Sequence, residues 1–223
     1  MANQAYLSIW SEDFSEDRML DQFKNFLSTV PLSATKPGFT HLVIRAVDPA
    51  ESPILEQDLR SMPLDADGIA QIISDHLHSD CSYEVRCHWD LTGLDPLTAV
   101  SKAEPQPLEI LCHGEDYDEG AWRENGHIQV DFGFEHLFTG HAGLLGIRQT
   151  AAAAQSPEEA RFLEAMAWPE NLEKYQQATK ANIRKLFDWI RAIEKALPVK
   201  QFRLWSEGEE NFEARLEEIL AAR

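Results

Sequence analysis

Residues 81–91 read CSYEVRCHWDL, an unbroken alternation of apolar and polar side chains. A period of two indicates a β-strand with one buried face and one hydrated face. Strands of a parallel sheet that is covered on both faces read instead as continuous apolar runs. The alternation therefore predicts an antiparallel or mixed sheet with an open polar face. We expect this face to be the functional surface of the protein.

Two later stretches, residues 108–112 and 128–134, alternate in the same way. The Asn125-Gly126 pair ahead of the second stretch is a turn signal. We therefore predict an antiparallel meander of three half-exposed strands. Further strands are expected at residues 5–10, at residues 39–47 and at the start of segment 201–222.

Helices are indicated by apolar residues at helical spacing between and after these strands. Asp13 with Glu16 matches a capping box at the start of the first helix, and a second helix is expected to begin near Asp67. Ser156 and Pro157 provide the cap and the first-turn proline of another helix.

The longest helix is predicted from Pro169 to Leu197, where Pro198 stops it. Its apolar residues follow heptad spacing over about two heptads. Such a seam either packs across the sheet of the same chain or forms a helix-mediated dimer, so monomer and dimer both stay open. The seam consists of Ile183, Leu186, Ile190, Ile193 and Leu197.

These elements predict an α+β fold with a single mixed, largely antiparallel sheet of about six strands and helices packed on one face. No linker divides the chain, so one domain over residues 1–223 is expected. Segments 49–63 and 92–107 contain several prolines and are predicted as irregular connections. Three tryptophans in or beside strands are interpreted as core residues: Trp10, Trp89 and Trp205.

The composition is that of a globular protein, because 43% of the 223 residues are hydrophobic and 26% are charged. No apolar stretch approaches the roughly 20 residues of a membrane-spanning helix. The first residues lack the basic and apolar blocks of a signal peptide. We therefore expect a cytoplasmic protein without membrane contact. Three cysteines without a C-x-x-C pair form neither a disulfide framework nor a zinc knuckle.

The charge balance is strongly acidic, since 38 acidic residues against 20 basic ones give a formal net charge of −18. Such a field repels the phosphates of nucleic acids and anionic lipids, so no nucleic-acid partner is expected. The same field attracts a basic protein partner, although it also keeps a protein soluble without any partner.

Motifs of common enzyme classes do not occur in the sequence. Glu135, His136 and His141 do not match the H-E-x-x-H zinc motif, and the series Gly140, Gly143, Gly146 matches neither a dinucleotide nor a phosphate loop. There is no G-x-S-x-G elbow. The sequence thus leaves enzymatic activity undecided and identifies no cofactor.

The main functional hypothesis is a non-enzymatic acidic binding protein, for example an immunity-type protein that neutralises a basic toxin. It would contact its partner through the open polar face and the acidic loop after the second strand of the meander. Trp122 in that loop is the candidate anchor if its side chain is exposed; the alternative is that it folds back onto the domain. The candidate binding residues are Glu84, Arg86, His88, Glu115, Asp116, Asp118 and Trp122.

The alternative hypothesis is a metal-dependent enzyme on the same sheet face. Imidazole and carboxylate groups are the usual ligands of zinc and iron sites. If the strands pair in the required register, such groups would converge. The candidate ligands are His88, His113, His127 and Asp131.

Overall fold

The computed structural model describes residues 3–95, 100–141, 144–145 and 156–222. Within these residues seven strands form one sheet of order β3-β2-β4-β5-β6-β1-β7, and every neighbouring pair is antiparallel. The strands are β1 (Gln4–Ser11), β2 (His41–Ala46), β3 (Leu55–Asp58), β4 (Cys81–Leu94), β5 (Ser101–His113), β6 (Ile128–Phe134) and β7 (Val199–Ser206).

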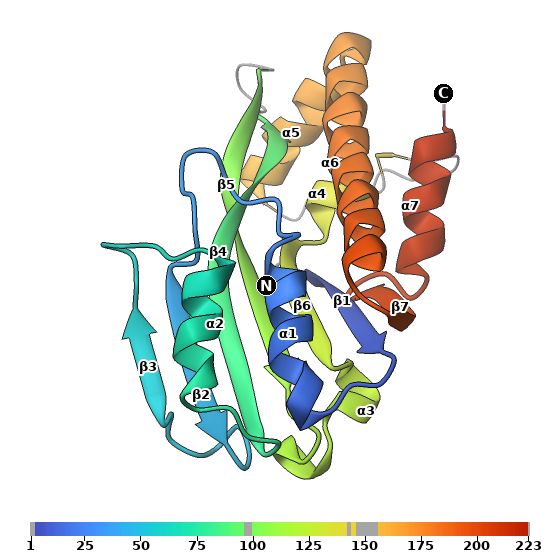
Figure 1. Cartoon of the computed structure of the whole chain (residues 1–223). Coiled ribbons are helices and arrows are strands. Elements are labelled where there is room, and N and C mark those ends of the chain that lie inside the picture. Colours follow the sequence, from blue (N-terminus) through green and yellow to red (C-terminus); the bar gives the residue numbers. More distant parts are fainter. Residues whose placement is uncertain (1–2, 96–99, 142–143, 146–155, 223) are drawn as a thin grey trace.

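The main helices lie on one side of this sheet, which confirms the predicted α+β class (Figure 1). They are α1 (Glu16–Leu27), α2 (Ala66–Ser74), α6 (Pro169–Ala196) and α7 (Phe212–Ala221). Shorter helices are α3 (Trp122–Asn125), α4 (His136–Thr139) and α5 (Pro157–Met166). None of the described helices has the length and apolarity needed to cross a bilayer.

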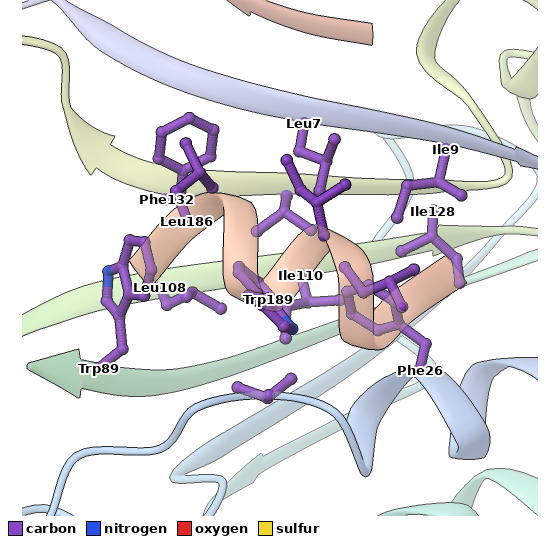
Figure 2. Close-up of a cluster of buried hydrophobic side chains, with 14 of the residues drawn as sticks. Leu7, Ile9, Phe26, Trp89, Leu108, Ile110, Ile128, Phe132, Leu186 and Trp189 are labelled. Carbon is purple, nitrogen blue, oxygen red and sulfur yellow. The ribbon is translucent and has the colours of Figure 1, made fainter. Parts of the chain in front are cut away.

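The hydrophobic core fills the space between the sheet and these helices. Trp89 of the alternating strand is fully buried there, as predicted, and its ring packs on Phe132, Phe138 and Trp189 with centroids 5.6–6.2 Å apart. Figure 2 shows Phe26 from α1 and Trp189 from α6 among the buried side chains of the strands. All three cysteines are buried and unpaired.

The seam of α6 faces the sheet of its own chain. Ile183 and Leu186 are fully buried, and Ile190 and Ile193 are nearly so. The seam is therefore covered within the chain and is not free to pair with a second copy.

The start of α1 differs from the prediction. Asp13 is not the cap: it lies in the turn after β1 with a left-handed φ of 50°, a conformation that aspartate tolerates better than most residues. Ser15 is the N-cap, because it has the extended backbone that precedes a first helical turn. The start predicted at Ser156 is correct, since the Ser156 hydroxyl accepts a hydrogen bond from the Glu159 N–H.

Two segments predicted as irregular contain strands. The segment 49–63 includes the short edge strand β3, which pairs only with β2. In segment 92–107, β4 continues to Leu94 and β5 begins at Ser101, so the two strands form a long hairpin. Pro105 and Pro107 are tolerated because this half of β5 pairs with β4 alone, and a missing N–H on an unpaired edge costs no ladder hydrogen bond.

Candidate functional site

A row of polar side chains runs across the open face of the sheet. Arg86 on β4 lies opposite Glu109 on β5, which lies opposite Asp131 on β6, which in turn lies opposite Tyr6 on β1. The residues directly before and after each of these four along the chain are buried in the core. The strict alternation of the strands therefore places these four side chains, the polar row, on the face away from the helices.

The polar row contains more carboxylates than cations. The Arg86 guanidinium contacts Glu84 at 2.5 Å through Nη2 and Glu109 at 2.9 Å through Nε. Partial burial and the charge of Glu84 nevertheless raise the pKa of Glu109. The pKa of Asp131 is also raised, chiefly by burial, although its carboxylate accepts a hydrogen bond from the Gly133 N–H. The Arg86 guanidinium thus contacts two of these acids, Glu84 and Glu109, whereas Asp131 is stabilised by the Gly133 N–H.

Aromatic side chains border the polar row at β1 and β7. Tyr6 stacks on Trp205 with ring centroids 4.3 Å apart, and its hydroxyl donates a hydrogen bond to Glu207. The Arg203 guanidinium lies 5.7 Å from the Trp10 ring and 5.5 Å from the Trp205 ring. Interpreting Trp10 and Trp205 as core residues was wrong, because both are half-buried on the open face.

A pocket of about 210 Å³ opens on the same face, beside the polar row. It lies where β2, β4, β5 and β6 meet the acidic loop, and we name it the His113 pocket. Its lining includes the apolar side chains of Val43 and Leu111 and the polar side chains of Ser82, Glu84, His113 and Tyr117. Ser82, His113 and Tyr117 are buried.

The two buried histidines have different surroundings. His127 lies between Phe14 and Trp122, with ring centroids at 4.2 and 4.5 Å, and its Nδ1 accepts a hydrogen bond from the Ser11 N–H. His113 lines the pocket; its ring nitrogens make no hydrogen bond of normal geometry, and the Gln129 side chain is the polar group that interacts with the ring. Burial lowers the pKa of both rings to about 4, so both are neutral at pH 7.

The predicted metal ligands are not brought together. His113 and His127 are neighbours through a backbone hydrogen bond, but Nδ1 of His127 is already occupied. His88 lies opposite Pro107, whereas His113 lies opposite Ser82, so the two histidines are separated along the β4–β5 pair. Asp131 belongs to the polar row. In the part of the chain that the structure describes, no three histidine, cysteine or acidic side chains are placed to hold one ion.

The acidic loop folds against the sheet instead of presenting a free anchor. Trp122 is half-buried in α3, and its Nε1 donates a hydrogen bond to the Glu115 carbonyl oxygen at 3.1 Å, so the side chain folds back onto the domain and is not fully exposed. Asp116 accepts a hydrogen bond from the Ser79 hydroxyl. Asp118 is exposed and lines the His113 pocket.

Of the predicted binding residues, Glu84, Arg86 and His88 share the open face, and Asp118 joins Glu84 at the pocket. His113, selected from the sequence as a metal ligand, also lines the pocket, whereas sequence reasoning missed Leu111 and Tyr117. The alternating pattern assigns Leu111 to the open face, but it does not reveal which strands lie beside it.

Comparison of the chain with protein-family models, with curated proteins and with solved structures finds no match.

Proposed function

We propose that this protein is a non-enzymatic binding module that holds a basic protein partner against the open face of its sheet. The observation that carries the proposal is the excess of carboxylates around Arg86 in and beside the polar row. Glu109 and Asp131 are partly desolvated, and their raised pKa values reflect burial with too few compensating cations.

A lysine or arginine from a partner would supply the missing positive charge. The Coulomb attraction of one such pair at about 4 Å is roughly 1–4 kcal/mol between the dielectric of water and that of a protein surface. Solvent screening and side-chain ordering reduce the net gain at this half-exposed surface to about 1 kcal/mol or less. The formal net charge of −18 also speeds encounter with a basic protein. The aromatic rings of Trp10 and Trp205 beside the row add contact area of the kind enriched in binding hot spots.

The finer form of the proposal is an immunity-type protein that masks a basic toxin in the cytoplasm. Three buried, unpaired cysteines suit a reducing compartment. Such a protein needs a surface of stable shape and no catalytic group. The helix-backed sheet supports this, since the polar row sits on strands whose other face is packed core.

The experiment measures binding of a hexa-lysine peptide by isothermal titration at low salt. The variant Glu109→Gln/Asp131→Asn alters the polar row, and Glu213→Gln/Glu217→Gln removes the same charge from exposed positions of α7. We expect the row variant to bind about tenfold more weakly and the α7 variant to bind almost as the parent does. Equal weakening in both variants would refute recognition by the open face.

A further inference from the structure

His113 is the least satisfied polar group of the pocket named after it. The residue is only 3% exposed, and neither ring nitrogen makes a hydrogen bond of normal geometry, although the Gln129 side chain interacts with the ring. Gln129 and Asp118 lie near the ring and partly offset the effect of burial on its pKa. A buried polar group without a partner costs about 1–3 kcal/mol. A ligand that supplies a donor to the accepting nitrogen would recover part of this cost.

The size of the pocket restricts what can enter it. An engineered cavity of about 150 Å³ holds one benzene molecule. The His113 pocket, at about 210 Å³, therefore accommodates a group slightly larger than benzene. An arginine side chain has this size, with a flexible apolar stem and a planar head. Val43 and Leu111 provide apolar walls for such a stem.

The pocket offers acceptors to a cation, although Arg45 lies in its lining and Arg86 contacts Glu84. The carboxylates of Glu84 and Asp118 line it, and the neutral imidazole of His113 accepts a hydrogen bond but adds no positive charge. Arg45 is the cation of the lining, and its Nη1 donates a hydrogen bond to the Glu51 carbonyl oxygen at 3.0 Å. A guanidinium offers several donors in one plane, which suits several acceptors around one small space.

The two loops that contribute Pro49 and Asp118 to the pocket have an unusual backbone. Val47, Asp118 and Glu119 have left-handed φ values of 72°, 48° and 53°, although none of them is glycine. The Asp118 N–H donates a hydrogen bond to the Val47 carbonyl oxygen at 2.7 Å, which joins the two loops. Backbone in sparsely populated conformations is concentrated at ligand clamps and other functional sites.

We infer that the His113 pocket is the receptor for one arginine side chain of the basic partner. The stem would lie along Leu111, and the guanidinium would donate to His113 and to the Glu84 carboxylate, which it would share with Arg86. This inference rests on the proposed function and makes it more specific, because it names the residue type that anchors the partner.

The test uses single-residue probes, N-acetyl-arginine methylamide and its lysine and citrulline counterparts, titrated into isotopically labelled protein and followed by NMR. We expect the arginine probe to bind at least about tenfold more tightly than the others and to shift the ring signals of His113. Equal binding of the lysine probe would overturn the inference, as would equal binding of the uncharged citrulline probe.

A pocket-filling variant separates this inference from the proposed function. Leu111→Phe adds volume at a half-buried wall, and Ile54→Phe makes a similar addition at an exposed aliphatic residue outside the pocket. We expect Leu111→Phe to abolish arginine-probe binding, with hexa-lysine affinity and melting temperature close to those of Ile54→Phe. Suppose that hexa-lysine still binds the Glu109→Gln/Asp131→Asn variant more weakly than the parent, but that Leu111→Phe leaves arginine-probe binding intact. The pocket inference then fails and the proposed function stands.

Discussion

Arg86 and Glu109 face each other directly across β4 and β5, and the guanidinium Nε lies 2.9 Å from the carboxylate Oε2. The same guanidinium contacts Glu84 on its own strand. Arg86 therefore keeps two acids close together that would otherwise repel each other, and it does so on a surface that carries further carboxylates.

Replacing Arg86 with glutamine should raise the pKa of Glu109 further, because its nearest cation is lost. A carboxyl group with a raised pKa costs stability above that pKa, and the cost is relieved as protonation removes the charge. We expect a loss of about 1 kcal/mol at pH 7, since the pair is half-exposed. The loss should shrink near pH 4. Urea unfolding of Arg86→Gln and of the control Arg191→Gln at both pH values checks this, and a pH-independent loss would contradict it.

The buried histidines should make the protein sensitive to acid. The pKa of each ring falls from 6.5 to about 4 on folding. Between these pH values the unfolded chain therefore binds more protons than the folded chain. The stability is fully present above about pH 6.5 and is lost as the pH falls toward 4, by roughly 2–3 kcal/mol per ring.

Urea unfolding between pH 7.5 and 4.5 measures this dependence. His127→Gln should flatten the stability curve over the acidic range, whereas the same substitution at exposed His78 is the matched control. An unchanged slope in His127→Gln would show that this ring is protonated equally in both states.

A buried amide joins the longest helix to the hairpin. Asn182 on α6 accepts a hydrogen bond from the Thr92 N–H at 2.7 Å and donates to the carbonyl oxygens of Thr92 and Leu137. Asn182→Ala would leave these main-chain groups unpaired, so we expect a loss of about 3 kcal/mol in unfolding free energy. Gln177→Ala, on the exposed side of the same helix, should change it by less than about 0.5 kcal/mol.

The sheet could be predicted from sequence where one face is buried and the other is hydrated. The alternation of 81–91 gives the correct strand and the correct inward residues, including Trp89. Strand β3 was missed because its sequence LEQD has no apolar alternation and gains its structure from pairing with β2 alone. The first half of β5 was missed because proline normally excludes a strand, except beside an unpaired edge.

The site could be predicted only in part, because it depends on strand register. Sequence assigns His88 and His113 to the same face, but the pairing puts Ser82 opposite His113 and Pro107 opposite His88. A pattern with a period of two fixes which face a side chain takes and not its neighbour across the strands. The pocket could not be predicted for the same reason, because its residues come from four strands and from the segments that follow β2 and β5.

The most direct test of the account is to map where a basic ligand binds. Amide chemical shifts of the labelled protein, recorded while hexa-lysine is added at low salt, locate the contact surface. We predict the largest changes at Arg86, Glu109 and Asp131 and in the strands that carry them. Changes of equal size along the outer residues of α7, or spread evenly over the acidic surface, would contradict binding at the open face.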